Sequence, residues 1–365
     1  MKIAFYGSSL VSSYWNGAAS YYRGLLGELA RFGHEIAFYE PDAFDRQARR
    51  DIEPPAWARS VVFANSPAAA RWAAREAAGA DVVIKASGVG VFDDALLEMS
   101  MAAAAPQALR LFCDVDAPAT VASLQAEPEQ PLRRMLPKLD AVIIFGGGPP
   151  ILEAYRALGA PFCAWIPNGL DPEVNRPTAR QMRFAADLSF LANRLPDREA
   201  RVERFFFTPA RNLPAKRFLL GGAGWERAEL PANVAALGHV PTTDHNAFNC
   251  SALAVLNVAR DSMAAAGWSP ATRVFEAAGA GACLISDDWP GLAHFFQPGE
   301  EILVARDGAD VAELLAGLTP VRASAIGAAF RARALADHSY ARRAAALDRL
   351  LKKLAARRRS AQRAA

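Results

Sequence analysis

The chain has 365 residues, 52% of them hydrophobic and 22% charged, a composition typical of an ordinary globular protein with room for two domains. A formal net charge of +3 is too small for a nucleic-acid-binding protein, so no nucleic-acid partner is expected. No apolar run approaches the roughly 18 residues of a membrane span, and the cysteines and histidines show no metal-ligand spacing.

The start of the chain predicts one strand, helix, strand unit. Lys2 to Tyr6 read as a strand, about Ala18 to Phe32 as an amphipathic helix, and His34 to Glu40 as a second strand. A right-handed crossover implies a parallel sheet with ligands at the carboxyl ends of its strands. The segments 7–10 and 15–19, which include Gly17, are therefore either ligand-facing loops or simple tight turns. Gly7 ends the first apolar run too early for a signal peptide, so a cytoplasmic protein is expected.

Three more buried strands are predicted in the first half, within residues 80–86, 109–116 and 139–145. Polar residues follow each strand at the sheet edge where active sites gather, among them Lys85, Asp114 and Asp116. Asp116 precedes Ala117-Pro118, so its carboxylate could accept a proton from a substrate hydroxyl or could cap the following helix.

A break in the pattern separates two halves of the chain. Residues 172–184 carry prolines and charges with little apolar pattern, which predicts a linker, and a new alternation begins with the strand 186–192. Arg194 and Arg198 follow this strand at the start of a helix, where guanidinium groups and free backbone amides together form an anion site. The alternative is that both arginines form surface ion pairs with Asp197 or Glu199.

The second half continues with strands predicted at 217–221, 233–240 and 252–258. The first ends in glycines that allow close backbone approach, and Arg260 follows the last, so it faces the same edge. His245 is expected to cap or pack a helix that starts near Thr242. A helix beginning near Pro270 carries Glu276 among small and apolar residues and leads into a strand over 282–286. This carboxylate needs a donor from elsewhere, such as the hydroxyls of a ribose, unless it is a plain surface residue.

The end of the chain is basic and helical. A last strand is predicted at 301–305, and Ala- and Arg-rich helices follow from Val311 onward. Lys352, Lys353 and several arginines crowd the end, which predicts a solvated helix end that frays, or a contact with anionic lipid or polymer. The expected domains are 1–172 and 186–337, with a linker at 173–185 and a C-terminal helix and basic tail at 338–365.

Several motifs resemble those of nucleotide-sugar glycosyltransferases of the GT-B fold, an α/β fold of two Rossmann-like domains facing across a cleft. Ile166-Pro-Asn-Gly-Leu-Asp171 looks like the signature that closes the N-terminal domain of the group 1, family-4-like enzymes. Asn193-Arg-Leu-Pro-Asp-Arg198 resembles their phosphate-binding loop, and residues 273–287 resemble their Glu-Ala-x-x-x-Gly block. With the segments 8–12, 114–120, 245–250 and 257–263, the closest likeness is to CgeB-like predicted glycosyltransferases.

The resemblance implies a role for each matching position. Glu276 would bind the donor ribose, and Arg194 and Arg198 would hold the diphosphate, with Gly17 and its loop closing over it. Arg260, which follows a strand at the same edge, is a further candidate for neutralising the diphosphate. The remaining donor-binding positions implied are Gly222, Gly224, His239, Val240, Ser269 and Arg273. No metal and no cofactor is expected, because the arginines neutralise the leaving diphosphate.

One position departs from the family pattern. Trp268 stands where the first glutamate of the paired motif is expected, and an indole cannot accept a hydrogen bond from a sugar hydroxyl. The prediction is a metal-independent, retaining transfer from a nucleoside diphosphate sugar to an unidentified acceptor hydroxyl; for an inverting enzyme, Asp116 or Asp114 would be the base. The alternatives are a nucleotide-sugar 2-epimerase and a non-catalytic nucleotide-sugar-binding or coat-assembly protein. No membrane span is expected, and the basic tail is the candidate for peripheral membrane contact.

Overall fold

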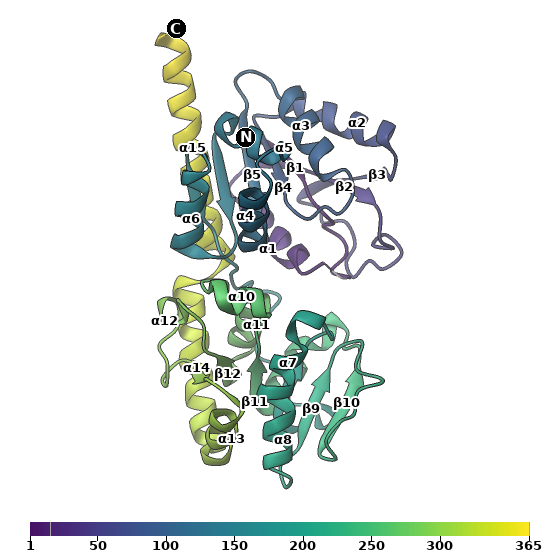
Figure 1. Ribbon diagram of the computed structural model, residues 1–365, viewed down its shortest axis with the longest axis vertical. Helices are drawn as coiled ribbons and strands as arrows, with labels where there is room; N and C mark the ends of the chain where they lie inside the picture. The colour runs from purple at the N-terminus through teal and green to yellow at the C-terminus, as the bar shows by residue number, and fades with distance from the viewer. Residues whose placement is uncertain (15, 365) are drawn as a thin grey trace. The chain divides into compact units, whose positions relative to one another are not determined.

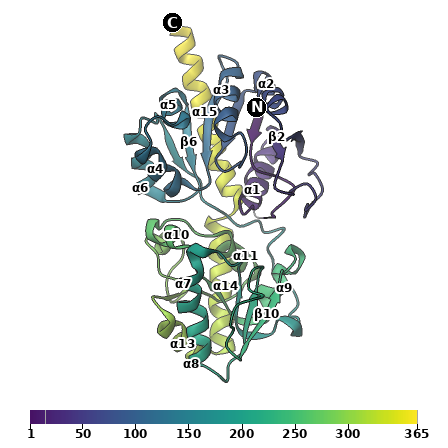
Figure 2. The same cartoon turned by 45° about the vertical axis from the view of Figure 1, so that its right-hand side comes forward.

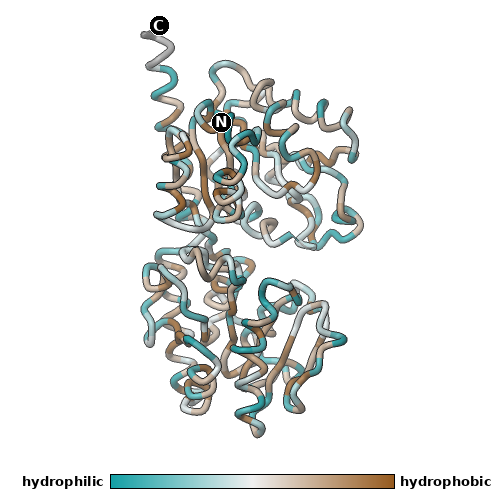
Figure 3. Tube along the Cα trace, viewed as in Figure 1, coloured by the Kyte–Doolittle hydropathy of each residue, from teal (hydrophilic) through white to brown (hydrophobic). Residues whose placement is uncertain are grey.

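The computed structural model describes residues 1–14 and 16–364, so Trp15, predicted on the ligand side, lies outside the described residues. The chain divides into two compact units, the first made of Met1–Pro167 with Tyr340–Ala365 and the second of Asn168–Ser339. Each unit is a parallel sheet covered by helices (Figure 1). Apolar residues run along the strands of both units (Figure 3), as expected for parallel sheets buried on both faces.

The sheet of the first unit has seven parallel strands in the order β3-β2-β1-β4-β5-β6-β7. The strands are β1 (Lys2–Tyr6), β2 (Glu35–Asp42), β3 (Ala58–Ala64), β4 (Val82–Ala86), β5 (Leu109–Asp114), β6 (Ala141–Ile144) and β7 (Cys163–Trp165). The order reverses direction at β1 and β4, as in doubly wound folds. β3 was not predicted, because only Phe63 in it is buried and its pattern is weak.

Helices cover both faces of this sheet. On one face lie α2 (Pro67–Arg75), α3 (Asp93–Ala103), α4 (Ala117–Ala126), α5 (Pro131–Met135) and α6 (Gly148–Ala157). On the other face lie α1 (Ala18–Arg31) and α15 (Tyr340–Ala364), whose buried side chains share one apolar cluster with β1, β4 and β5. The last helix of the chain is thus part of the first unit.

The docking of α15 has specific contacts. The ring of Tyr340 packs where a side chain on Gly24 of α1 would lie, and Leu347 and Leu351 are buried against the sheet. At its other end Arg358 donates to Asp140 at 2.5 Å. The helix continues to Ala364, and the fraying of its basic end stays a prediction. The leucines at helical spacing give it an apolar face that the sheet buries.

The second unit has six parallel strands in the order β10-β9-β8-β11-β12-β13. The strands are β8 (Ala186–Leu191), β9 (Phe218–Gly221), β10 (Val234–Gly238), β11 (Ala252–Asn257), β12 (Leu284–Asp287) and β13 (Leu303–Ala305). The helices are α7 (Glu199–Val202), α8 (Thr208–Asn212), α9 (His245–Ser251), α10 (Asp261–Ala266), α11 (Thr272–Ala280), α12 (Leu292–Phe295), α13 (Gly308–Gly317) and α14 (Pro320–Asp337). A π-helical segment, Glu203–Phe207, joins α7 to α8 and places three phenylalanines in the core.

The division into units differs from the predicted boundaries in two places. The segment predicted as a linker, 173–185, packs within the second unit: Asn246 receives a hydrogen bond from the Arg176 backbone, and Arg180 donates to the Ser251 carbonyl. The residues from Tyr340 onward return to the first unit. Among the described residues, no helix is long and apolar enough to cross a membrane.

Candidate functional site

The predicted donor-binding residues of the second unit gather at the carboxyl ends of its strands. Since every strand pair of this sheet is parallel, the loops after β8, β9, β10 and β11 and the end of β12 lie at one edge. Arg194 and Arg198 follow β8, Gly222 and Gly224 follow β9, His239 and Val240 follow β10, and Arg260 follows β11. Ser269, Arg273 and Glu276 lie before and on α11, which leads into β12.

Arg198 is a largely buried cation with a second cation, Arg273, close to it. Its Nη2 donates to the Asn193 carbonyl at 2.5 Å, while its buried Nε has no hydrogen-bond partner among the described residues. Burial, together with the neighbouring Arg273 guanidinium, lowers the pKa of Arg198 to about 10. Two guanidinium groups that repel each other at one place are expected where an anion binds between them.

Arg273 supplies the second of these cations. It lies in the first turn of α11, and its Nη1 is buried with no partner in the part of the chain that the structure describes. Burial lowers the pKa of Arg273, and the nearby Glu276 carboxylate partly offsets that effect. Both arginines therefore hold an unsatisfied donor, and they are near enough for their charges to interact. An unpaired buried donor is costly, so a ligand oxygen is the expected partner.

Glu276 lies one turn further along α11, on the same face as Arg273. Its Oε2 atom is 3.8 Å from Nδ1 of His245, and the Glu276 side chain is 17% exposed. Burial lowers the pKa of His245, although the carboxylate opposes this, so the imidazole is neutral near pH 7. A half-buried carboxylate beside a neutral imidazole keeps lone pairs for hydroxyl donors. His245 is the first residue of α9 and lies beside Glu276, while the N-cap position is Asp244, whose side chain makes no capping hydrogen bond.

The other two predicted arginines form ion pairs. Arg194 Nε donates to the Glu199 carboxylate, and Arg260 Nε lies 2.5 Å from Asp197 Oδ2. The sequence left open that Arg194 and Arg198 pair with Asp197 or Glu199. Both carboxylates do form ion pairs, but the partner of Asp197 is Arg260 and not Arg198. Both pairs are about 40% exposed, and exposed pairs contribute little to stability. A phosphate oxygen can therefore replace the carboxylate at small cost.

A second layer beneath this edge was missed by the sequence reasoning. Asp287, at the end of β12, is fully buried and accepts hydrogen bonds from Arg201 at 2.6 Å and from the Ala259 amide at 3.0 Å. Burial raises the pKa of Asp287, and these donors counteract that rise. The pair ties the loop that carries Arg260 to the helix that follows Arg198. Two features of the sequence could have indicated this pair: Arg201 lies one turn beyond Arg198, and Asp287 ends a predicted strand.

Glycines let the backbone pass close to this edge. Gly222 has φ +119°, and a Cβ built on it would lie 2.1 Å from the Ala192 carbonyl oxygen. Gly224, at φ +91°, would place a Cβ 3.0 Å from Cβ of Arg194. Val240 is buried, whereas His239 is exposed. No side chain fits at Gly222, so this position of the loop after β9 presents backbone alone.

The loop before α11 is strained. Trp268 has φ +54°, a left-handed conformation that is rare for a bulky residue, and its amide donates to the Pro290 carbonyl at 2.7 Å. Its ring occupies the space that a side chain at Gly291 would need. Ser269 is buried and donates from Oγ to the Gly267 carbonyl at 3.0 Å. Strain held by packing of this kind is typical of functional loops.

The first unit carries the three remaining predicted residues. Asp114 is fully buried, and its carboxylate accepts hydrogen bonds from Ser87, Thr120, Tyr155 and the Asp116 amide. Burial raises its pKa, which the hydrogen bonds oppose. A carboxylate so enclosed has the features of a structural group rather than a base that a substrate reaches.

Asp116 is the more accessible of the two aspartates. It stands at the N-cap position of α4, but its side chain makes no capping hydrogen bond, so the capping interpretation is wrong. Its carboxylate has no partner among the described residues and is half-buried at the carboxyl end of β5. That position leaves it available to a substrate hydroxyl.

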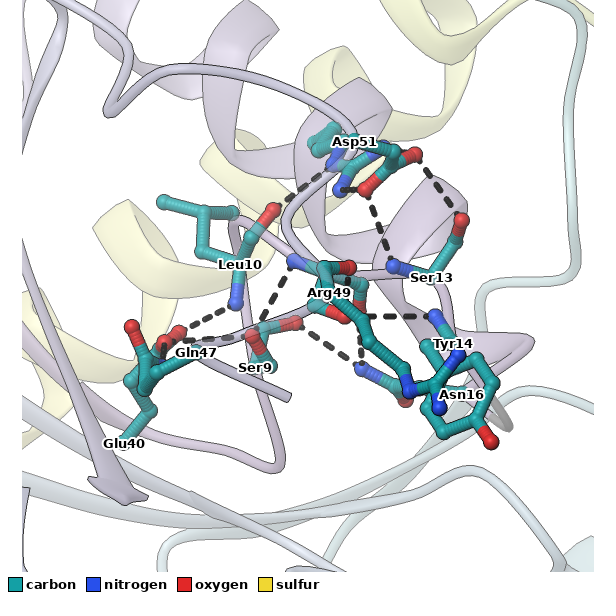
Figure 4. A network of polar contacts seen from close by, with 11 residues as sticks. Ser9, Leu10, Ser13, Tyr14, Asn16, Glu40, Gln47, Arg49 and Asp51 are labelled. Carbon is teal, nitrogen blue, oxygen red and sulfur yellow. Dashed lines mark hydrogen bonds and ion pairs between the residues drawn. The ribbon is translucent and has the colours of Figure 1, made fainter. Parts of the chain in front are cut away.

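Gly17 begins α1 after a loop that a polar network holds in place (Figure 4). The buried Glu40 carboxylate accepts from Ser9 Oγ at 3.1 Å and from the Leu10 amide at 2.5 Å. Asp51 accepts from Arg23 and Ser13 on the other side of the loop. Gly17 itself is exposed, and a Cβ there would meet no atom within 4 Å. The loop is thus fixed by side chains on both flanks.

The chain resembles known glycosyltransferases in sequence family and in fold. Residues 198–349 match the family model described as glycosyl transferase-like, a stretch that includes Arg198, Arg260, Arg273 and Glu276. No curated protein sequence matches the chain significantly. The family match, together with the fold, supports a glycosyltransferase.

Solved structures share the fold over nearly the whole chain. Sucrose-phosphate synthase from Thermosynechococcus elongatus superposes with a TM-score of 0.71 at 17% identity, covering 98% of this chain and 99% of that one. The Anabaena protein HepE in complex with UDP and glucose gives 0.68 at 12%, covering 97% and 100%. An alpha-glucosyltransferase in complex with UDP and a 13-mer DNA gives 0.69 at 10%, covering 96% and 99%. The predicted GT-B fold of two Rossmann-like sheets is confirmed; the CgeB-like subgroup stays a prediction.

Proposed function

We propose that the protein transfers a sugar from a UDP-sugar to an acceptor hydroxyl. The observation that carries this proposal is the pair of guanidinium groups, Arg198 and Arg273, whose buried nitrogens lack partners among the described residues. A diphosphate supplies oxygens to both at once. The glycosyl transferase-like family match and the UDP complexes of HepE support a nucleoside diphosphate sugar, and UDP in particular, as the source of that diphosphate.

The arginines account for the chemistry of the leaving group. The bond between the sugar's anomeric carbon and the phosphate oxygen breaks, and the acceptor oxygen forms the new bond to that carbon and releases its proton. Negative charge then develops on the diphosphate. Arg198, Arg273 and Arg260 stabilise this charge in a low-dielectric setting, and Arg194 adds to the field, so the transfer is proposed to proceed without a metal.

The nucleoside is proposed to lie over α11 and the ends of β9 and β10. Glu276 accepts hydrogen bonds from the two ribose hydroxyls, and His245 beside it stays neutral, which leaves the carboxylate free. The backbone at Gly222 and Gly224 passes under the nucleoside without side chains in the way. The backbone at the exposed His239 and the buried Val240 supplies groups for the base. Ser269 is proposed to contact the diphosphate from the turn before α11.

Retention of the donor's anomeric configuration is the proposed outcome. If the products retain the donor's anomeric configuration, no enzymic base is required, and the acceptor hydroxyl loses its proton to the departing phosphate. If they invert, Asp116 is the better base, because it is half-buried and has no partner among the described residues, whereas Asp114 is enclosed. The anomeric proton of the product, followed by NMR, distinguishes the two outcomes. Gly17 and its loop are proposed to close over the diphosphate.

A thermal-shift screen tests the donor assignment. The purified protein is heated with UDP, GDP, ADP, dTDP and their common sugars, and in parallel as Glu276→Ala. A ligand that binds only the folded state at a hundredfold excess over Kd stabilises it by about 2.7 kcal/mol. The expected result is a shift with UDP and a UDP-sugar that shrinks in the variant. A larger shift with another nucleotide would contradict the uridine assignment, and no shift with any nucleotide would contradict donor binding altogether.

The two other functions considered from the sequence are separated by turnover on the donor. A 2-epimerase converts the UDP-sugar with no acceptor present, which mass spectrometry and NMR of the donor alone detect. A non-catalytic binding protein gives the thermal shift but releases no UDP with any acceptor or with water. Neither is favoured by an observation on this chain, since the family match and the fold are those of glycosyltransferases.

A further inference from the structure

The exposed side of the last helix carries an uncompensated positive charge. Residues 340–365 contain nine basic residues and a single acidic one, Asp348, although the whole chain has a net charge of only +3. The rest of the protein is therefore net negative. Asp348 is buried and already bonded to His34 at 2.9 Å and to Lys352 at 2.8 Å. The positive charge of this helix is thus concentrated on its outer surface.

Three of the exposed cations form one ridge. Arg349, Lys353 and Arg357 are spaced by four residues and are all exposed, so they follow one another along about 12 Å of the helix surface at 1.5 Å per residue. Arg359 extends the basic surface on the adjoining side. Among the described side chains, no carboxylate pairs with any of these four residues. Like charges four residues apart destabilise a helix, so the ridge has a cost in the free protein.

The opposite side of the helix cannot take part in binding. Leu347, Leu350, Leu351 and Leu354 are buried in the apolar cluster of the first unit. The C-terminal end of α15 extends beyond the strands of that unit in both views (Figures 1 and 2). The helix can therefore bind a partner only through its charged side chains. It cannot insert an apolar face into a membrane as free amphipathic helices do, because its leucines are already buried.

We propose that the basic ridge of α15, Arg349, Lys353, Arg357 and Arg359, binds the surface of an anionic lipid membrane. A straight row of flexible cations with no groove fits a plane of negative headgroups. Nucleic-acid sites instead place aromatic rings or amide side chains between their cations, whereas the exposed neighbours of this ridge are Lys352, Ala356 and Ser360. The net negative remainder of the protein is repelled by the same membrane, so the ridge also orients the protein on it.

Sedimentation with vesicles tests the ridge. The full-length protein is mixed at 50 mM and 300 mM salt with vesicles of phosphatidylcholine alone and with 30% phosphatidylserine. The triple variant Arg349→Gln/Lys353→Gln/Arg357→Gln is compared with Arg71→Gln/Arg75→Gln/Arg156→Gln, which removes the same charge from exposed positions elsewhere in the first unit. Since each cation near such a surface contributes roughly fivefold in affinity, the ridge variant is expected to lose at least tenfold in binding to anionic vesicles.

The expected pattern is binding to anionic vesicles only, weakened by salt, lost in the ridge variant and kept in the control. Circular dichroism confirms that both variants are folded. Failure of the unaltered protein to bind anionic vesicles at 50 mM salt overturns the proposal, as does an equal loss in both triple variants. Tighter binding to a 30-base-pair duplex or a 30-nucleotide RNA than to the vesicles, lost in the ridge variant, would assign the ridge to nucleic acid instead. None of these outcomes depends on the donor site.

Discussion

Arg198 and Arg273 show at the scale of single residues how the candidate site is kept ready for an anion. Each guanidinium has a lowered pKa, caused first by burial, and each has a buried nitrogen without a partner in the described part of the chain. In the protein without ligand, these two buried nitrogens form no hydrogen bond within the described residues. A bound diphosphate would satisfy both nitrogens and raise both pKa values, so the binding free energy includes relief of a cost already present.

Glu276→Ala is expected to weaken UDP binding about ten- to hundredfold. A carboxylate that accepts hydroxyl hydrogen bonds contributes roughly 1.5–3 kcal/mol, and its loss appears in the dissociation constant measured by calorimetry. The control is Glu229→Ala, which removes an exposed carboxylate from the same unit and should leave the UDP affinity unchanged. Equal affinities for the unaltered protein and Glu276→Ala would refute the ribose role.

Gly222→Ala is expected to destabilise the second unit by about 2–4 kcal/mol. Its backbone has φ +119°, and the new Cβ would lie 2.1 Å from the Ala192 carbonyl, so the two backbone segments must separate. Urea unfolding measures the loss. Gly317→Ala is the matched control, because nothing lies within 4 Å of its Cβ position and its φ is not positive. Similar stabilities for the two variants would show that the close approach is not needed.

The sequence predicted which residues stand at the strand ends, but not their partners. Arg194, Arg198, Arg260 and Glu276 occupy the expected strand and helix ends, because apolar runs bounded by glycine and polar residues define where strands stop. The enclosure of Asp114 by three side chains and a backbone amide could not be predicted, since Tyr155 lies 41 residues away. The Arg201 to Asp287 contact, across 86 residues, was missed for the same reason.

At the scale of elements, the loop between β1 and α1 is held by carboxylates from two other segments (Figure 4). Asp51 accepts from Arg23 at 2.9 and 2.7 Å and from Ser13 at 3.0 and 2.8 Å. Burial raises the pKa of Asp51, but these hydrogen bonds outweigh burial and the pKa is lowered overall. The loop's order therefore depends on an ionised carboxylate.

Asp51→Asn is expected to lower the free energy of unfolding by about 1–2 kcal/mol at pH 7. A lowered pKa in the folded state stabilises the protein above the unfolded-state pKa near 4, and this contribution disappears as pH falls through the folded-state pKa. The difference between the variant and the unaltered protein should therefore shrink below pH 4. Urea titrations between pH 7 and pH 3.5 measure it, with the exposed Asp42→Asn as control. A difference independent of pH would mean that the charge has no role.

Docking of α15 on α1 gives a paired prediction. Gly24→Ala would place a Cβ 2.1 Å from the Tyr340 ring and is expected to destabilise the first unit by about 1–3 kcal/mol. Gly27→Ala, one turn further along the same helix, meets Trp57 at an ordinary 3.4 Å and should be neutral or stabilising by up to about 1 kcal/mol. Thermal unfolding compares them. Equal effects would mean that Tyr340 moves aside freely.

Helices and strands with a strong apolar periodicity were predicted well. The unit to which the last helix, α15, belongs was not predicted. The helix expected at 18–32 is Ala18–Arg31, because its apolar stripe and the glycine that follows it are local signals. β3 was missed because an edge strand needs few buried residues. The leucines of α15 predict a buried face, but nothing local in the sequence specifies which sheet buries it.

At the scale of the whole molecule, the chain crosses between its two units twice. It leaves the first unit after Pro167 and returns at Tyr340, so the second unit is an insertion between a large N-terminal segment and one C-terminal helix. The two GT-B sheets were predictable from alternating strand and helix patterns. The return of the last helix was not, because it depends on apolar contacts between residues more than 300 positions apart, such as Tyr21 with Tyr340.

This connectivity sets an order of events during synthesis on the ribosome. Residues 168–339 contain everything that the second unit needs and can fold as soon as they emerge. The first unit, although translated earlier, lacks part of the cover on the sheet face that α1 and α15 share until Leu347, Leu351 and Leu354 have emerged. The usual sequence, in which the N-terminal domain matures first, is thereby reversed. The nascent chain therefore exposes part of an apolar sheet face while residues 168–339 are synthesised, and a ribosome-associated chaperone is the factor expected to shield it.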